Sequence, residues 1–231
     1  MTLTVASYNV HGCVGIDRRE DPPRIARVLR ELDADIIALQ ELDNYQHDGT
    51  WCRHIDYMSQ QLSMESVAGP TLWRDRGEYG IAILTRLPVR ASQRHEISVR
   101  LREPRCVLEC ELVHGDRSLR VVATHLGLRV QERHRQVQLL ANLLAQAEPV
   151  MPTVLLGDFN EWLRRSRPIR RIERVMGHAP SVRSFPARWP VLALDRIWVR
   201  PVSHLRSLQA VSTIDSRIAS DHLPIRAILD L

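Results

Sequence analysis

The sequence contains no lysine, so arginine supplies all 32 of its basic side chains. The formal net charge of +5 and the isoelectric point near 9.5 would ordinarily favour an anionic partner such as nucleic acid or acidic lipid. A complete absence of lysine is more typical of a genome-wide codon bias than of selection at one binding surface. Local clusters of arginine are therefore more informative than the total charge.

Long apolar runs are also absent, and so are pairs of cysteines at the spacing of a metal-binding motif. No stretch of about 18 apolar residues occurs, so we expect no membrane-spanning helix. The start MTLTVASYNV lacks a basic head, so we expect no signal peptide and a cytoplasmic location. The cysteines Cys13, Cys52, Cys106 and Cys110 fit reduced core thiols better than metal-binding knuckles or a disulfide framework. With 44% hydrophobic residues and no linker, residues 1–231 are expected to form one globular domain.

The residues that are present alternate between strand and helix patterns, which is typical of an α/β fold. Residues 2–10 alternate as a strand, Asp21 and Pro22 begin a helix, and residues 34–40 form an apolar strand that is expected to end at Glu41. A second unit repeats this layout. It has a strand at 120–124, a helix at 131–147 and a strand at 153–156, and further strands are expected at 81–84, 106–113, 193–199 and 225–229.

In both units, polar side chains follow the ends of the expected strands. Asn9 and Glu41 are 32 positions apart, and His125 and Asp158 are 33 positions apart. Ligand sites of open sheets gather at strand ends, so we expect these four side chains to converge on one crevice.

Six short motifs hold the unusual polar residues. They combine carboxylates, amides and two histidines, and the sequence shows neither a Ser-His-Asp order nor a glycine-rich phosphate loop. The motifs are YNVHG at 8–12, QE at 40–41, THL at 124–126, GDFN at 157–160, LDRI at 194–197 and SDHLP at 220–224.

This ordered set resembles the endonuclease/exonuclease/phosphatase superfamily, which has the fold of pancreatic deoxyribonuclease, and the resemblance covers nearly the whole chain. GDFN and SDHLP are its most specific motifs. The resemblance implies a four-layer α/β/β/α sandwich whose two packed sheets are mixed or mainly antiparallel. It also implies divalent-metal hydrolysis of phosphoesters.

The resemblance also implies a metal site. Glu41 matches the family's metal glutamate, and Asp221 is the expected second ligand. Magnesium suits such a site because it takes oxygen ligands and needs only one or two carboxylates, and manganese is an alternative. His11 stands where several abasic-site nucleases carry a ligand aspartate. Imidazole is a poorer partner for magnesium, so we expect one tightly held ion, with His11 either a weak contributor or a bystander.

Two candidates emerge for activating water. His222 would accept the proton if Asp195, which resembles the family's histidine-orienting acid, held its imidazole in place. Asp158 is the competing candidate, and the sequence does not separate them.

The remaining site candidates would hold the phosphate. The amides of Asn9 and Asn160 would donate hydrogen bonds to its oxygens without adding charge. His125 resembles the nuclease-type histidine, which donates to a phosphate oxygen or protonates the leaving group. Glu78 is a weaker candidate for orienting His125.

Basic residues are densest in the Arg164–Arg174 segment, just after GDFN. These arginines either grip a second phosphate or an anionic headgroup, or form the solvated face of a helix whose apolar face is Ile169, Ile172 and Val175. Arg102 and Arg105 are further weak candidates. Trp162 either stacks on a substrate ring or packs beneath the GDFN loop.

The sequence therefore predicts a magnesium-dependent phosphoric ester hydrolase. We expect in-line attack of water on a phosphodiester, or a phosphomonoester, of a small-molecule or lipid substrate, because 231 residues leave little beyond the sandwich for wrapping a duplex. The alternative is a DNA or RNA nuclease, and a non-catalytic binding module is a third hypothesis. An anionic membrane surface is a further, weakly supported partner.

Overall fold

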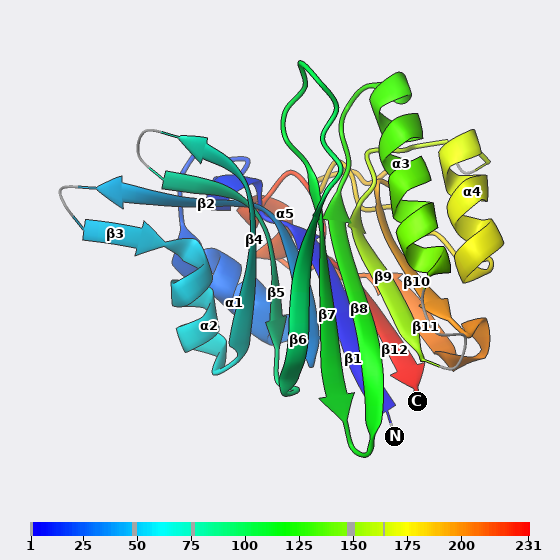
Figure 1. Ribbon diagram of the computed structural model, residues 1–231. Coiled ribbons are helices and arrows are strands. Elements are labelled where there is room, and N and C mark those ends of the chain that lie inside the picture. Colours follow the sequence, from blue (N-terminus) through cyan, green and yellow to red (C-terminus); the bar gives the residue numbers. More distant parts are fainter. Residues whose placement is uncertain (1, 48–49, 75–76, 147–150, 164) are drawn as a thin grey trace.

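The computed structural model describes residues 2–47, 50–74, 77–146, 151–163 and 165–231. Two β-sheets pack face to face, and helices cover their outer faces (Figure 1). The first sheet follows the order β11-β12-β1-β2-β5-β4, with β3 paired to β2, and the second follows β10-β9-β8-β7-β6.

The strands of the first sheet are β1 (Thr2–Asn9), β2 (Ile36–His47), β3 (Thr50–Arg53), β4 (Glu65–Arg74), β5 (Gly77–Thr85), β11 (Leu205–Ala210) and β12 (Ile225–Asp230). Those of the second sheet are β6 (Val89–Glu96), β7 (Cys106–His114), β8 (Arg117–His125), β9 (Thr153–Asp158) and β10 (Asp195–Arg200). The helices are α1 (Pro22–Leu32), α2 (His54–Leu62), α3 (Val130–Ala145), α4 (Arg167–Met176) and α5 (Ser216–Ala219), with short 3-10 turns at His11–Cys13 and Val202–His204.

Both sheets are mixed, as predicted. β1 pairs with β2 in parallel and β8 pairs with β9 in parallel, whereas the other strand pairs are antiparallel. The two parallel pairs are the two repeated units that the sequence predicted. The two strands of each unit run in the same direction. The polar residues at or near their C-terminal ends therefore lie at the same end of each sheet.

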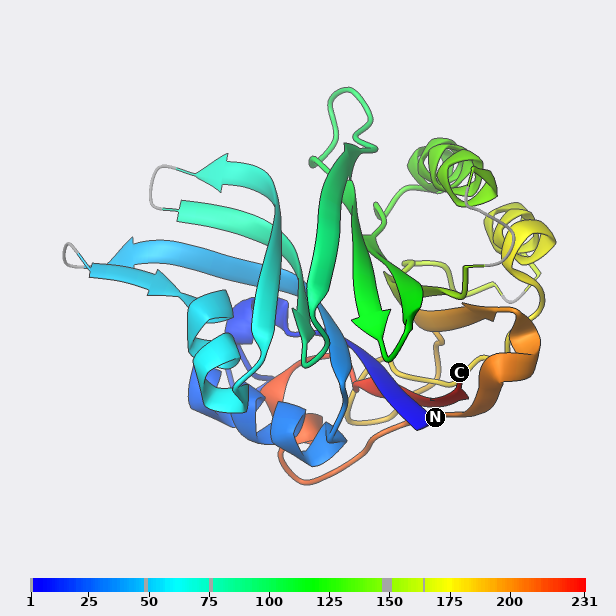
Figure 2. The same ribbon diagram turned by 60° about the horizontal axis from the view of Figure 1, so that its bottom comes forward.

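Three apolar clusters fill the spaces between the four layers of the fold. The cluster between the sheets includes Val5 from β1 and Val121 from β8, both fully buried. A second cluster packs α1 and α2 against the first sheet, and a third packs α3 and α4 against the second. Figure 2 shows the two helical layers on opposite sides of the paired sheets. This confirms the predicted α/β/β/α sandwich.

The expectation that the strand after α1 ends at Glu41 is wrong. β2 continues to His47, because β5 and β3 pair with its second half. The pairing of β2 with β5 changes register between Leu39 and Leu42, and Glu41 has a left-handed backbone with φ of 58°. Glu41 therefore lies at a β-bulge inside β2, not at the end of the strand, and the bulge changes the direction of its side chain.

The cysteine prediction is confirmed wherever the side chains are described. Cys13, Cys106 and Cys110 are buried and free, and the last two face the core between the sheets. The side chain of Cys52 lies outside the described residues. Among the described residues, no helix is long and apolar enough to cross a membrane.

Candidate active site

The candidate site lies where the parallel strands of the two sheets end. Asn9 is the last residue of β1, and His125 and Asp158 are the last residues of β8 and β9. Nδ2 of Asn9 donates a hydrogen bond to Oδ2 of Asp158 over 3.1 Å, which joins the ends of the two sheets. The predicted convergence of both units on one place is therefore observed.

Gly157 sets the position of Asp158. It has φ of 147°, and a Cβ atom added there would collide with the backbone oxygen of Thr124 on β8. Glycine thus permits the close approach that places Asp158 opposite His125 in the β8–β9 register. The following turn is fixed by Asn160, whose backbone N–H donates to Oδ1 of Asp158 over 2.8 Å.

Glu41 reaches the same place from the bulge in β2. Its Oε1 accepts a hydrogen bond from Nδ2 of Asn9 over 2.8 Å and lies 3.8 Å from Nε2 of His125. The Asn9 amide therefore bridges the carboxylates of Glu41 and Asp158. A left-handed backbone at a residue other than glycine is strained, and such strain concentrates at functional sites.

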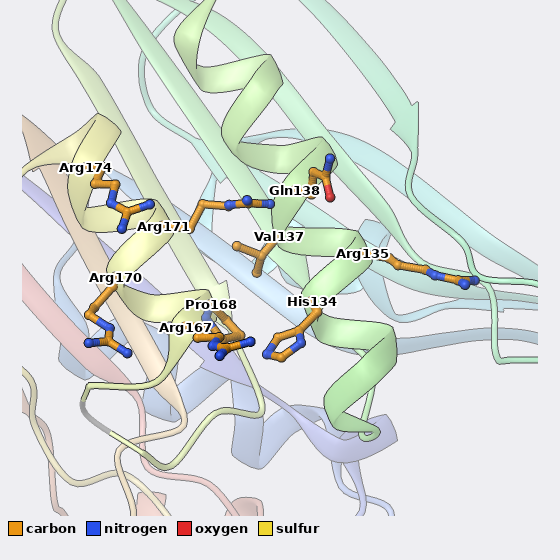
Figure 3. A pocket seen from close by; sticks show the side chains of 9 residues that line it. All are labelled: His134, Arg135, Val137, Gln138, Arg167, Pro168, Arg170, Arg171 and Arg174. Carbon is orange, nitrogen blue, oxygen red and sulfur yellow. The ribbon is translucent and has the colours of Figure 1, made fainter.

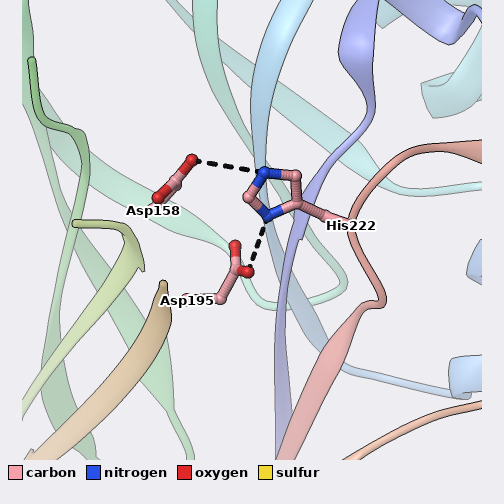
Figure 4. A group of neighbouring side chains, drawn as sticks. All are labelled: Asp158, Asp195 and His222. Atoms are coloured by element: carbon pink, nitrogen blue, oxygen red, sulfur yellow. Dashed lines mark hydrogen bonds and ion pairs between the residues drawn. The ribbon is translucent and has the colours of Figure 1, made fainter. Parts of the chain in front are cut away.

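His222 contacts two carboxylates of the site, those of Asp158 and Asp195, as Figure 4 shows. Its Nδ1 lies 2.8 Å from Oδ2 of Asp195, and its Nε2 lies 3.8 Å from Oδ2 of Asp158. Ser184, which the sequence interpretation missed, donates its hydroxyl to Oδ2 of Asp195 over 2.5 Å. No motif marks this serine, because it lies in an irregular segment before β10.

His125 is enclosed by polar groups on both ring nitrogens. Nδ2 of Asn160 lies 3.2 Å from Nε2 and donates to the backbone oxygen of Leu126, whereas Nη1 of Arg105 lies 3.4 Å from Nδ1. Neutral imidazole has one acceptor nitrogen, so Arg105 and Asn160 cannot both donate to it at once. Among the described contacts, Arg105 rather than Glu78 adjoins His125, so the orienting role of Glu78 stays a prediction.

Burial and neighbouring charges move three pKa values in this cluster. Burial, aided by the charge of Arg105, lowers the pKa of His125 well below its usual value. Burial also lowers the pKa of His222, but the carboxylates of Asp195, Asp158 and Asp221 together outweigh that effect and raise it to about 10. Burial and the nearby Asp195 charge raise the pKa of Asp158. The environment thus favours a neutral His125 and a protonated His222.

Two arrangements in the cluster could hold a divalent cation. Asp158, Asp195 and His222 offer ligand atoms within 4.8 Å of one another. However, the Asp195–His222 hydrogen bond already engages Nδ1, and imidazole is a poor ligand for magnesium. Glu41 and Asp158 present carboxylate oxygens on either side of Nδ2 of Asn9, and carboxylate oxygens suit magnesium better. The donor set around Glu41 therefore fits the ion that the sequence predicted.

Asp221 and His11 border this cluster. Oδ1 of Asp221 lies 3.9 Å from Nδ1 of His11, and both side chains are well exposed. The backbone N–H of His11 donates to Oδ1 of Asn9 over 3.1 Å, which ties its turn to the site. Among the described residues, no contact joins Asp221 to Glu41. Its role as a metal ligand stays a prediction.

The arginine-rich segment forms α4 and the turn before it. Ile169 and Ile172 are buried against the second sheet and Val175 is partly buried there, so the predicted apolar helix face is confirmed. Arg164 lies outside the described residues. Trp162 is 49% exposed, and the guanidinium of Arg133 lies 5.4 Å from the centre of its ring. The expectation that Trp162 packs beneath the GDFN loop is therefore wrong.

Comparison with known proteins decides the family. Residues 6–222 match the family model described as Endonuclease/Exonuclease/phosphatase family. The chain belongs to the endonuclease/exonuclease/phosphatase family. Members of this family are phosphoester hydrolases, and they generally depend on a divalent metal.

A curated relative and several solved structures are similar to this chain over 99–100% of its length. The uncharacterized protein YbhP of Escherichia coli K12 is 28% identical over 246 residues, which span 100% of this chain and 97% of YbhP. A family structure from Beutenbergia cavernae gives a TM-score of 0.80 at 21% identity, covering 100% of this chain and 72% of that one. The mannosyl-6-phosphatase Bt3783 of Bacteroides thetaiotaomicron gives 0.77 at 18% identity, covering 99% and 100%. D. rerio TDP2, complexed with a single-strand DNA product, gives 0.71 at 17% identity, covering 100% and 99%.

Proposed function

We propose that this chain is a magnesium-dependent hydrolase of phosphodiesters or phosphomonoesters. The observation that carries the proposal is the cluster at the strand ends, where Glu41, Asn9, Asp158 and His125 contact one another directly. Glu41 would hold the ion, with Asp221 as the predicted second ligand. A bound magnesium ion would screen the phosphate oxygens and stabilise the charge that develops on the leaving oxygen.

The amides and His125 position the phosphate. Nδ2 of Asn160 donates one hydrogen to Leu126 and would give the other to a phosphate oxygen without adding charge. Nδ2 of Asn9 donates both of its hydrogens to Glu41 and Asp158, so it would reach a phosphate oxygen only by releasing one of these carboxylates. His125 lies beside Asn160 and Glu41. It supplies a donor to a phosphate oxygen from a buried position that holds the ring in one orientation.

His222 and Asp158 are the two candidates for taking the proton of the attacking water. Asp195 fixes Nδ1 of His222, so Nε2 is the ring nitrogen directed toward Asp158 and the site. Both oxygens of Asp158 already accept hydrogen bonds, from Asn9 and from the backbone of Asn160. However, the pKa of His222 is raised to about 10, so Nε2 already carries a proton at neutral pH and would donate to a phosphate oxygen. The pKa of Asp158 is raised only to about 6, so its carboxylate is the group that can accept the proton of water.

We propose a small-molecule or lipid phosphoester as the substrate. Two loops that follow site strands carry exposed apolar side chains, namely Leu128 after β8, which is 70% exposed, and Trp162 after β9. Such side chains offer a surface for the non-phosphate part of a substrate. A nuclease is the second candidate, favoured by the arginine-rich face of α4 and by the likeness to TDP2.

The test is a magnesium-supplied activity panel with Glu41→Gln as its main variant. The panel contains bis-aryl phosphate, aryl phosphate, inositol phosphates, phosphatidyl lipids, sphingomyelin, plasmid DNA and RNA. We expect hydrolysis of a small or lipid phosphoester that is lost on metal removal and falls by about two orders of magnitude or more in Glu41→Gln. The matched control is Glu31→Gln, an exposed carboxylate on α1, which should retain full activity.

Two results would count against the proposal. Undiminished turnover of Glu41→Gln would remove Glu41 from the metal site. Hydrolysis of nucleic acids alone, with a steep fall of affinity as salt rises, would replace the small-substrate proposal by the nuclease.

A further inference from the structure

A groove runs between α3 and α4 on the outer face of the second sheet. It encloses about 480 Å³, and no residue of the catalytic cluster borders it. Figure 3 shows four arginines on α4, with His134 of α3 beside Arg167, whereas Arg135 extends from α3 on the side away from α4. The groove is lined by His134, Arg135, Val137 and Gln138 of α3 and by Arg167, Pro168, Arg170, Arg171 and Arg174 of α4.

All five arginines of the groove are exposed, and its lining contains no acidic residue. Within the part of the chain that the structure describes, none of the five forms an ion pair or a side-chain hydrogen bond. Arginines elsewhere do find acids. Arg24 lies 2.7 Å from Asp17, and Arg120 lies 2.5 Å from Glu109. The groove is therefore a concentration of positive charge that the protein itself does not neutralise.

The arrangement of these arginines on α4 opposes helix formation. Arg167 and Arg171 are four residues apart, as are Arg170 and Arg174, and like charges at this spacing repel one another. The helix persists because its other face is buried in the core and because the Ser166 side chain caps its first turn. A bound anion would relieve the repulsion, so the groove gains from a ligand of opposite charge.

The guanidinium group matches phosphate, because its paired N–H donors engage two phosphate oxygens at once. Arg167 and Arg174 are seven residues apart, and seven residues of α-helix rise about 10 Å. One phosphate group does not span that length. Gln138 adds an uncharged donor from the opposite helix. The groove therefore suits a ligand that carries several phosphate groups in a row.

The lining distinguishes among carriers of phosphate. Its two apolar members, Val137 and Pro168, are buried, so the groove offers no side chain for insertion among lipid tails. It contains no Phe, Tyr or Trp on which a nucleic-acid base could stack. These features favour a compact soluble oligophosphate over a membrane or a nucleic-acid strand.

We propose that the groove between α3 and α4 is a binding site for an oligophosphate anion, separate from the catalytic cluster. A neighbouring cavity shares Arg135 with the groove, but it differs in chemistry, because the carboxylate of Glu132 lines it beside Arg100, Arg102 and Arg129.

The test is calorimetric titration of the whole protein with inorganic tripolyphosphate, in buffer containing EDTA. No metal-dependent hydrolysis occurs under these conditions, so the measurement is independent of the proposed function. The groove variant is Arg167→Gln/Arg171→Gln/Arg174→Gln. The control is Arg18→Gln/Arg117→Gln/Arg206→Gln, which removes the same charge from exposed positions outside the groove. Thermal unfolding of both variants checks that they fold.

We expect saturable binding that weakens by at least about tenfold in the groove variant and by less than about twofold in the control. An absence of binding to the unsubstituted protein would overturn the proposal, and so would equal weakening in both variants. Two further titrations use phosphatidylglycerol vesicles and a single-stranded oligothymidylate. Binding of either that depends on the groove arginines and is tighter per phosphate than that of tripolyphosphate would overturn the assigned ligand.

Discussion

Asp195 is the residue on which the orientation of His222 depends. Its Oδ2 accepts from the hydroxyl of Ser184 and pairs with Nδ1 of His222, and the whole group is buried. Among the described residues, Oδ1 of Asp195 has no hydrogen-bond partner. The carboxylate is therefore held by few contacts, and each of them matters for where Nε2 of His222 points.

Replacing Ser184 by alanine tests this dependence. Loss of the hydroxyl leaves a buried carboxylate oxygen with one donor fewer, so we expect about 1–3 kcal/mol less unfolding free energy. We also expect turnover to fall by about tenfold and the pH–rate profile to shift, because the carboxylate that Ser184 contacts raises the pKa of His222. Ser184→Thr keeps the hydroxyl and should restore the profile. A lower melting temperature with an unchanged profile would reduce Ser184 to a purely structural role.

At the scale of elements, apolar periodicity and caps predicted the strands and helices that carry the site. The N-cap at Asp21 begins α1 as expected, since its carboxylate accepts from the backbone N–H of Arg24 over 2.9 Å. The interpretation failed at Glu41, because a bulge is set by pairing with β5, a strand 36 positions or more further along the chain. The sequence around Glu41 does not show which distant strand will pair with it. Ser184 was missed for the same reason, since only folding brings it to Asp195.

Gly157 offers a prediction at this scale, because it sets the spacing of β8 and β9. Gly157→Ala introduces both a strained φ and a collision with Thr124, so we expect the unfolding free energy to fall by at least about 2 kcal/mol. Gly115→Ala is the matched control. It also has positive φ, of 61°, but a Cβ there meets nothing within 4 Å, so it should cost about 1 kcal/mol. Equal losses in urea unfolding of the two variants would show that the close approach of the strands is unimportant.

At the scale of the whole molecule, the sandwich brings together six residues from six parts of the chain. Asn9 and Glu41 come from the first sheet, and His222 comes from the loop before β12. The second sheet supplies His125, Asp158 and Asp195. The order of motifs predicted this convergence, whereas the substrate depends on loops and side-chain positions that no motif describes. The arginines of α4 illustrate the difference. The sequence allowed two interpretations of these arginines, as an anion-binding group or as the solvated face of a helix. The structure shows that they border a groove.

The most direct test of the metal site is anomalous diffraction from crystals soaked in manganese, which takes the same oxygen ligands as magnesium. The account predicts one strong peak at about 2.2 Å from a carboxylate oxygen of Glu41, and loss of that peak in crystals of Glu41→Gln. A peak bound by Asp195 and His222 with Glu41 out of reach would contradict the account, as would an unchanged peak in the variant.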